Sequence, residues 1–240
     1  MAVVWQRQAN GTLYEVRKAG KSVRLYSNGV LHTQYHPDHV ISGAIWDLLL
    51  LPAFLMTTPP KKILLLGLGG GALVNSIRYF FPQSEIDCVD IDPIHIQVAQ
   101  RWFNIPKSNV TVHLGDAYEF LKGADKRYDW IIDDVFQHVS GEPERCQPVS
   151  ETLKLIGRCS SKSGLVSLNL IGKHQIKSLR KAKAGKNGNL YQFTHPLYEN
   201  RIVAITKSAV SLPDMKNRMN QFKELDQRRK TCRLKYRVRK

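Results

Sequence analysis

Residues 61–72 have the sequence KKILLLGLGGGA, which is the strongest indication of the fold class in this chain. The four consecutive apolar residues 63–66 predict a strand that is covered on both faces, because a half-exposed strand alternates with polar residues. A glycine-rich turn at 67–72 follows, and apolar spacing over 73–81 predicts a helix that stops before Pro82. A buried strand that turns through glycines into a helix is typical of an α/β sheet.

The alternation of strand and helix continues along the chain. We expect further strands at 86–91, 110–114, 128–133 and 164–171, and helices at 94–103, 117–121 and 149–158. Residues 190–194 and 202–206 can pair as a final hairpin. Because right-handed crossovers place helices on both faces of such a sheet, the pattern predicts a doubly wound, mostly parallel α/β sheet.

The segments on either side of this region have other patterns. Residues 1–38 alternate apolar and polar side chains between glycine-containing turns, which predicts an N-terminal β-hairpin region of two or three short antiparallel strands. Residues 39–51 repeat apolar side chains at helical spacing and begin the α/β domain, which we extend to residue 210. Residues 211–240 are expected to form a basic helix that fades into a tail.

The composition is that of a folded chain with one unusual feature, its charge. With 240 residues of which 42% are hydrophobic, the chain is neither a disulfide miniprotein, nor a collagen, nor fully disordered. The four cysteines lack paired spacing and no stretch suits an export signal or a membrane span, so we expect a cytoplasmic protein with reduced thiols. The formal net charge is +16, and residues 171–240 alone hold 19 Lys and Arg against 4 Asp and Glu.

Glycines and acidic residues follow four successive predicted strands. After the first come Gly67, Gly69, Gly70 and Gly71; after the second, Asp90 and Asp92; after the third, Asp116; at the fourth, Asp133 and Asp134. The carboxyl ends of parallel strands form one edge of a doubly wound sheet, where ligands bind. Glycines let the backbone approach a ligand closely, and a carboxylate 23 residues beyond Gly67 can accept the ribose hydroxyls. Together these residues predict a nucleoside site.

Two nucleoside cofactors fit the glycine turn. GLGGGA satisfies the dinucleotide fingerprint, whose last position tolerates Ala. However, the first basic residue after the turn that could hold a pyrophosphate is Arg78, and the GDA segment at 115–117 has no role in an NAD site. We therefore favour S-adenosylmethionine, or a relative of it, over NAD.

The motifs ILLLGLGGGA, CVDIDP, AQRWF, LGDAYEF, YDWIIDD and GLVSLNL, in this order, resemble the spermidine-synthase-like branch of class I S-adenosylmethionine-dependent transferases. YSNGVLHTQ resembles the small N-terminal β-domain of aminopropyltransferases, and the likeness covers roughly residues 20–172. The resemblance implies a seven-stranded, Rossmann-like sheet. It also implies that Asp90 binds ribose beside Ile91, that Asp116 and Ala117 line the adenine, and that Asp134 takes the position of the family's catalytic aspartate.

The chain departs from the aminopropyltransferase pattern at several positions. Gly70 stands where that family has an Asp in the glycine loop, and Gln137 stands where it has a second Asp after the fourth strand. His32 corresponds to a pocket Gln, and Ile41 and Ser42 correspond to a Tyr-Gln pair. Because burying the ammonium groups of a polyamine without carboxylate partners is costly, these changes argue against spermidine synthesis.

We therefore predict methyl transfer from S-adenosylmethionine, with Asp134 as general base. Asp133 should face the opposite side of the strand, where a solvent-facing or helix-capping role is expected. The candidate substrate contacts are His32, Phe136, Gln137 and His138. Two alternatives stay open: an aminopropyltransferase that uses decarboxylated S-adenosylmethionine, and a non-catalytic nucleic-acid-binding module on the same fold.

The remaining predictions concern metal binding and partner molecules. His32, His36 and His39 are close in sequence, but no Cys or carboxylate cluster completes a ligand set, so no metal is expected. The basic C-terminal third predicts either contact with RNA, DNA or an acidic protein, or a solvated tail. No membrane contact is expected, and the family resemblance implies a homodimer.

Overall fold

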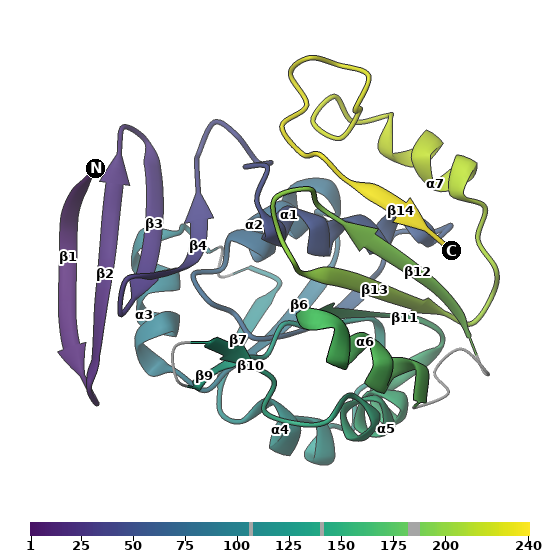
Figure 1. The fold of residues 1–240 in the computed structure, drawn as a ribbon, viewed down its shortest axis with the longest axis horizontal. Helices are drawn as coiled ribbons and strands as arrows, with labels where there is room; N and C mark the ends of the chain where they lie inside the picture. The colour runs from purple at the N-terminus through teal and green to yellow at the C-terminus, as the bar shows by residue number, and fades with distance from the viewer. Residues whose placement is uncertain (106–107, 140–141, 182–187) are drawn as a thin grey trace.

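The computed structural model describes residues 1–105, 108–139, 142–181 and 188–240. A large central sheet lies beside a separate four-stranded N-terminal sheet (Figure 1). A short antiparallel hairpin, β9 (Gln137–Val139) and β10 (Glu142–Glu144), lies between β8 and α5, in a region for which the sequence predicts no element.

The central sheet has eight strands in the order β14-β12-β13-β11-β8-β5-β6-β7. They are β5 (Lys62–Leu66), β6 (Glu85–Asp90), β7 (Val110–Leu114), β8 (Tyr128–Asp133), β11 (Ser160–Leu170), β12 (Asn189–Thr194), β13 (Arg201–Thr206) and β14 (Arg237–Arg239). Neighbours from β11 to β7 are parallel, whereas β13 is antiparallel to β11 and β12. The doubly wound, mostly parallel sheet is confirmed. The predicted seven strands become eight because β14 adds to the edge beside β12.

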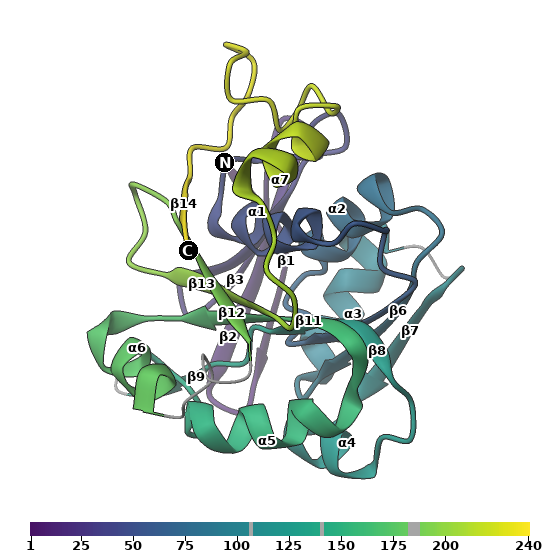
Figure 2. The same cartoon turned by 90° about the vertical axis from the view of Figure 1, so that its right-hand side faces the viewer.

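Helices cover both faces of this sheet (Figures 1 and 2). On one face lie α4 (Ala117–Gly123), α5 (Val149–Cys159) and α6 (Gly172–Lys181); on the other lie α1 (Ile45–Leu50), α2 (Ala72–Phe80) and α7 (Leu212–Met219). Along β5, Ile63 and Leu65 belong to the core on the α1 and α2 side, and Leu64 and Leu66 to the core on the α4 and α5 side. Residues 63–66 are therefore apolar without alternation because both faces of the strand are buried.

The N-terminal sheet consists of β1 (Ala2–Ala9), β2 (Thr12–Ala19), β3 (Ser22–Ser27) and β4 (Val30–Tyr35), paired antiparallel in sequence order. It packs against α3 (Pro93–Trp102), where Val16 and Leu25 join Ile94 and Val98 in one apolar cluster. The prediction of two or three strands misses β1. Because most side chains of β1 are exposed, it lacks the alternation by which a half-buried strand is recognised.

The helix predicted over 39–51 begins later than expected. The buried carboxylate of Asp47 accepts hydrogen bonds at 2.6–3.1 Å from the backbone N–H groups of three residues before the helix, Ser42, Gly43 and Ala44. These bonds hold the chain in a turn until α1 starts, and a 3-10 helix, Leu51–Leu55, follows it. In the described ranges no helix combines the length and apolar character needed to cross a membrane.

The expected C-terminal tail is not a tail. After α7, Leu225, Cys232 and Leu234 are buried, and the chain returns to the central sheet as β14. Every second residue near the end is apolar or aromatic, so an extended segment can bury one side while its cations face outward.

Candidate functional site

Gly67 begins the turn between β5 and α2 with a φ of 86°. A Cβ at this position would lie 2.4 Å from the backbone oxygen of Asp134. The Asp134 N–H in turn donates to the Leu66 carbonyl at 2.9 Å. Only glycine fits both the left-handed φ and this close approach, so the glycine turn and the residue after β8 are held against each other.

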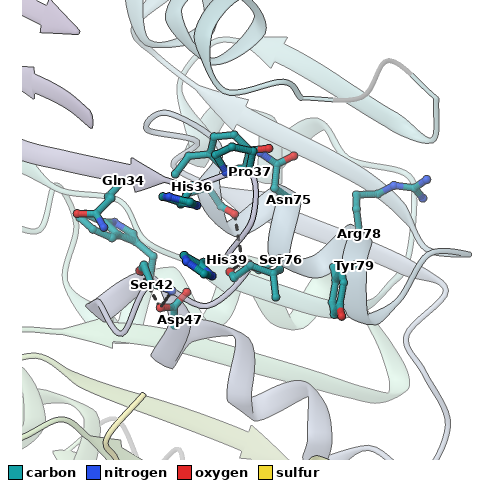
Figure 3. A pocket seen from close by; sticks show the side chains of 14 residues that line it. Gln34, His36, Pro37, His39, Ser42, Asp47, Asn75, Ser76, Arg78 and Tyr79 are labelled. Atoms are coloured by element: carbon teal, nitrogen blue, oxygen red, sulfur yellow. Dashed lines mark hydrogen bonds between the residues drawn. The ribbon is translucent and has the colours of Figure 1, made fainter. Parts of the chain in front are cut away.

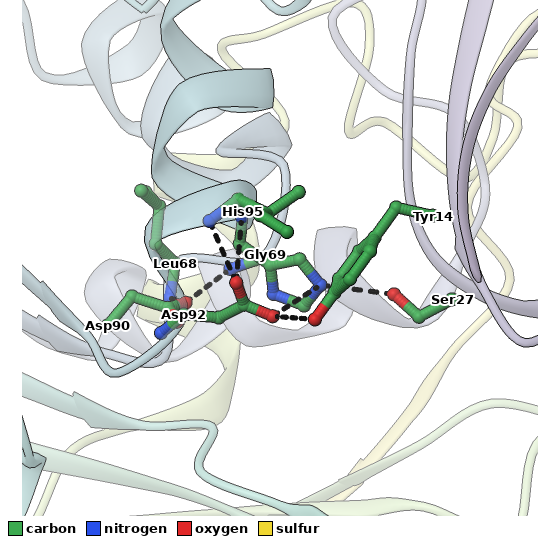
Figure 4. Close-up of polar contacts among 8 residues, drawn as sticks. Tyr14, Ser27, Leu68, Gly69, Asp90, Asp92 and His95 are labelled. Carbon is green, nitrogen blue, oxygen red and sulfur yellow. Dashed lines mark hydrogen bonds and ion pairs between the residues drawn. The ribbon is translucent and has the colours of Figure 1, made fainter. Parts of the chain in front are cut away.

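Asp90, at the end of β6, fixes the glycine turn through hydrogen bonds to its backbone (Figure 4). Its Oδ2 accepts the N–H groups of Leu68 at 2.8 Å and Gly69 at 3.1 Å, and its Oδ1 accepts the N–H of Asp92 at 2.9 Å. A carboxylate offers about four lone-pair positions, so one remains for a ligand hydroxyl. The ribose contact of Asp90 stays a prediction, and its shaping of the turn is an additional role.

Asp92 connects this edge to the N-terminal sheet (Figure 4). Its Oδ1 caps α3 by accepting the N–H of Ile94 at 2.8 Å, while its Oδ2 accepts the hydroxyl of Tyr14 on β2 at 2.7 Å. His95, one turn into α3, has its Nε2 3.2 Å from the Ser27 hydroxyl. Burial, with the neighbouring Asp92, raises the pKa of Tyr14 to about 12, so the phenol remains a donor.

Two large apolar side chains are exposed at the ends of adjacent strands. Ile91 is 69% exposed and Leu114 is 63% exposed. The residue before Ile91, Asp90, lies opposite Leu114 in the β6–β7 pair. Exposed aliphatic residues at the ligand-binding edge suit the flat apolar face of a nucleobase. The adenine ring of an adenosyl group has such an apolar face, so Ile91 and Leu114 are suitable residues to pack against it.

Asp116 and Ala117 lie where β7 passes into α4. Asp116 is exposed, and its Oδ1 caps the helix by accepting the N–H groups of Tyr118 at 2.8 Å and Glu119 at 2.9 Å. Ala117 is buried in the first turn. The cap accounts for one carboxylate oxygen of Asp116, and its contact with adenine stays a prediction.

Asp133 and Asp134 have different surroundings, as the alternation of a strand predicts. The expected solvent-facing or capping role of Asp133 is wrong: its side chain is fully buried and forms an ion pair with Arg145, whose side chain is 4% exposed. Arg145 also donates through Nη1 to the carbonyl of Asn169 at 3.1 Å. A carboxylate enclosed in the sheet needs a cation, and Arg145 supplies it.

Asp134 is partly buried, and no ion pair joins it to a cation among the described residues. Its Oδ1 accepts the side-chain amide of Asn169 at 2.7 Å, and the Asn169 oxygen accepts the amide of Asn200 at 3.0 Å. Burial raises the pKa of Asp134 to about 7; the hydrogen bond from Asn169 lowers it and the charge of Asp133 raises it. A carboxyl group that titrates near neutral pH is suited to proton transfer.

Two of the remaining turn glycines, Gly70 and Gly71, are tightly packed. A Cβ on Gly70 would lie 2.0 Å from Cγ2 of Thr33, and one on Gly71 would lie 2.2 Å from Cδ1 of Ile105. His32 is brought to the turn, since its backbone oxygen lies 3.6 Å from a Cβ on Gly69. His32 and the glycine turn are therefore neighbours, as the predicted site requires.

The other candidate substrate contacts lie on the segment after β8. Phe136 is partly buried, with the Arg145 guanidinium 6.0 Å from its ring centre. Gln137 is exposed at the start of β9. The backbone of His138 pairs with Pro143, and its side chain lies outside what the structure describes.

A separate cleft of about 360 Å³ lies between α2 and the segment after β4 (Figure 3). His36 and His39 stack in it with ring centres 4.4 Å apart, and Ser76 donates to the Val40 carbonyl at 3.1 Å. The predicted cofactor residues do not line it. In the described ranges no group of three or more His, Cys, Asp and Glu could hold a metal. The candidate site is therefore the strand-end edge.

Sequence reasoning missed three contributors to this edge. Arg145 lies in an irregular segment with no motif, and only the need of a buried carboxylate for a cation could have indicated it. Asn169 lies in the apolar strand pattern GLVSLNL, which gives no sign of its hydrogen bond to Asp134. Tyr14 gave only a strand signal, because its partner Asp92 is 78 residues away in the chain.

The fold and the edge together define a doubly wound α/β protein with a titratable carboxyl group beside its glycine turn. The family model of the spermine/spermidine synthase domain matches residues 48–217, and the chain belongs to this family. The resemblance to spermidine-synthase-like class I S-adenosylmethionine-dependent transferases is thereby confirmed.

Two kinds of relative are similar in sequence. A polyamine aminopropyltransferase of Vibrio vulnificus (strain CMCP6) is 31% identical over 185 residues, 73% of this chain and 59% of the relative. An eEF1A lysine and N-terminal methyltransferase of Mus musculus is 39% identical over 105 residues, 42% of this chain and 15% of the relative. The chain thus spans less than two thirds of the length of either relative.

Solved structures confirm the fold. A probable spermidine synthase from Corynebacterium glutamicum ATCC 13032 has a TM-score of 0.74 at 16% identity, over 92% of this chain and 88% of that one. Human methyltransferase-like protein 13 in complex with SAH has a TM-score of 0.61 at 23% identity, over 72% of this chain and 87% of that one.

Proposed function

We propose that this protein is an S-adenosylmethionine-dependent transferase and that the group it transfers is methyl. The family supports the transferase class, and its relatives include both aminopropyltransferases and methyltransferases. The choice between methyl and aminopropyl as the transferred group rests on the residues that line the site in this chain.

The observation that carries the choice is the packing at Gly70. This is the loop position where aminopropyltransferases have an Asp, but here a Cβ would lie 2.0 Å from the side chain of Thr33 and 3.0 Å from Phe103. Thr33 is buried on β4, so an acidic side chain could enter only if the N-terminal sheet moved. The position where that family has its second Asp is Gln137. Asp133 is already neutralised by Arg145.

A polyamine acceptor would bring two or more ammonium groups into this edge. Each buried ammonium needs a carboxylate partner, because desolvation of an unpaired charge costs several kcal/mol. Among the acidic residues discussed, Asp134 alone combines partial burial with the absence of an ion pair in the described structure. One such carboxylate suits a proton-accepting role better than the binding of a polycation.

The mechanism assigns separate tasks to the residues of the edge. When bound, S-adenosylmethionine supplies a methyl group activated by its sulfonium. The glycine turn and Asp90 fix the nucleoside, Ile91 and Leu114 exclude water from its base, and Asp134 accepts the proton that the attacking nucleophile loses. Holding the reactants in line is the main contribution of the protein, since the methyl donor is already activated.

Asn169 supports Asp134 in this role. Its amide occupies Oδ1 of Asp134, which leaves Oδ2 for the proton of the acceptor. With a pKa of about 7, the carboxylate is present in a useful fraction at neutral pH and is still basic enough to take a proton.

The test is a comparison of thermal stabilisation by S-adenosylmethionine, its decarboxylated form, methylthioadenosine and NAD. A ligand at 100 times its Kd stabilises the folded state by about 2.7 kcal/mol. We expect S-adenosylmethionine to stabilise more than its decarboxylated form, and NAD to give no shift. A larger shift with the decarboxylated form would refute methyl transfer, and no shift with any adenosyl compound would refute the transferase assignment.

Aminopropyl transfer is the second candidate, because the relative that aligns over 73% of this chain is a polyamine aminopropyltransferase. It predicts product formation from decarboxylated S-adenosylmethionine and putrescine. Absence of that product, together with methyl transfer to a protein, nucleic acid or small-molecule acceptor, would settle the choice in favour of methyl.

A further inference from the structure

The last ten residues, TCRLKYRVRK, end in β14, and buried and exposed side chains alternate along them. Cys232 and Leu234 are 2% and 0% exposed, and Tyr236 and Val238 are partly buried. The alternate residues Arg233, Lys235, Arg237 and Arg239 are all exposed. We call these four side chains the cation row.

The backbone beneath the cation row is fixed at several points. Arg237 and Arg239 lie opposite Thr194 and Gln192 in the β12–β14 pair. Upstream, the side-chain amide of Gln227 donates to the carbonyls of Leu234 at 3.4 Å and Tyr236 at 3.3 Å. These contacts hold the backbone beneath the row, and its last part, β14, lies beside β12 at the edge of the central sheet (Figure 1).

The charge of the row is not balanced within the described part of the chain. Within residues 188–240, the ion pairs join Arg228 and Arg229 to Asp226. Neither of these pairs includes a member of the cation row. Residues 231–240 contain five Lys and Arg and no Asp or Glu. Four neighbouring cations that have no ion-pair partner among the described residues attract a polyanion, because its binding releases condensed counterions.

We propose that the cation row binds the phosphate backbone of a nucleic acid strand. Arg237 and Arg239 are alternate residues of β14 and lie about 6.6 Å apart along the strand, which is similar in scale to the separation of successive phosphates along a nucleic acid. Three of the four side chains are Arg, whose fork of N–H donors matches phosphate oxygens. Because Tyr236 points inward, with its hydroxyl 3.7 Å from the Met219 sulfur, the row lacks an exposed ring for base stacking, and the binding is independent of sequence.

An acidic protein segment is a weaker match. Addition of a partner strand to a sheet edge needs main-chain pairing and pockets for alternate side chains. β14 is only three residues long, and the outward side of the segment carries cations. The wider charge of the chain, with a pI of about 9.8, also favours a polyanion with a long, uniform field.

The experiment measures binding of the full chain to a labelled single-stranded RNA of about 20 nucleotides, by fluorescence anisotropy over a series of salt concentrations. The row variant combines R233Q, K235Q, R237Q and R239Q. The control variant removes the same number of charges from exposed positions elsewhere, with K21Q, K62Q, K122Q and K154Q. If all four cations contact phosphates, the slope of log K against log salt should be shallower by about 3 in the row variant, and nearly unchanged in the control.

Three results would overturn the proposal: no binding by the native chain at low salt, equal slopes for the row and control variants, or row-dependent binding of polyglutamate that matches or exceeds that of RNA. A second measurement does not depend on the folding of the row variant. In the native chain, bound RNA should protect Lys235 from acetylation several-fold while Lys62 stays reactive; equal reactivity with and without RNA would contradict the proposal. Both measurements omit S-adenosylmethionine, so their failure leaves the proposed transferase function untouched.

Discussion

The ends of β6 and β8 both carry a pair of acidic residues, but they use them differently. At β6, Asp90 accepts three backbone N–H groups, and Asp92 caps α3 and accepts the hydroxyl of Tyr14. At β8, Asp133 is neutralised by Arg145, and Asp134 accepts one side-chain amide. A carboxylate fixed by the backbone therefore shapes a site, whereas one with few partners is free to exchange a proton.

The largest effect is expected from D134N, which removes the proposed base without changing the size of the side chain. General-base catalysis contributes about 10²–10⁴-fold to a rate, so methyl transfer should fall by that factor. The affinity for S-adenosylmethionine should change less than threefold, since the nucleoside is fixed at β6. The measurements are transfer of labelled methyl to a mixture of protein, RNA and polyamine acceptors, and ligand binding by calorimetry.

A matched control for D134N is E119Q, which neutralises an exposed carboxylate on α4. It should leave the transfer rate unchanged. If D134N kept full turnover, the proposed division of roles between β6 and β8 would be lost. If it abolished cofactor binding instead, Asp134 would belong with Asp90 as a residue that shapes the site.

Removal of Arg145 should have the next largest effect, on stability. R145M removes the cation that pairs with the buried charge of Asp133, and loss of one member of a buried ion pair costs about 3–5 kcal/mol. The unfolding free energy in urea should fall by that amount. K154M breaks the exposed pair of Lys154 with Glu151 and should change it by less than about 1 kcal/mol. The double variant D133N/R145M should recover part of the loss; no recovery would show that Arg145 acts through other contacts.

The sequence predicts the central sheet well because its signals are local. Residues 110–114 and 128–133 are strands with the predicted bounds, since apolar runs and the following turn lie within one segment. The role of Asp133 was not predictable in this way, because its partner Arg145 comes from an irregular segment with no pattern of its own. In the segment that forms β14, apolar and basic residues alternate with the period of a strand. Because the segment carries so many cations, a solvated tail was predicted instead. What the sequence could not supply is which distant segments meet.

The site was predictable in outline for the same reason. The glycines and strand-end acids are found by their position after strands, and the structure brings Gly67, Asp90 and Asp134 to one edge. Their individual partners were not predictable. Whether Asp116 contacts a ligand or only caps α4 depends on geometry that the LGDAYEF motif does not contain.

A third prediction concerns the pH dependence of the unfolding free energy, which can be measured without knowing the methyl acceptor. The pKa of Asp134 is raised in the folded state to about 7, above its unfolded value of about 3.9, so its protonated form stabilises the fold. That contribution is complete below about pH 4 and is lost as the pH rises towards 7, by at most about 1.4 kcal/mol per pH unit. Asn cannot ionise, so D134N should gain stability relative to the native chain over this window. The same difference at pH 4 and pH 8 would contradict the raised pKa.

The smallest effect is expected from Y14F, which tests whether the N-terminal sheet supports the β6 end. Loss of the hydroxyl removes one hydrogen bond to Asp92 Oδ2, while the Oδ1 cap of α3 remains. We expect a loss of about 1 kcal/mol in unfolding free energy and a severalfold weaker binding of S-adenosylmethionine, because the Asp92 N–H is one of the three that orient Asp90. Y79F is the control, since exposed Tyr79 donates its hydroxyl to partly buried Glu224, away from the site. Equal ligand affinities in the two variants would mean that the N-terminal sheet adds stability but does not shape the nucleoside site.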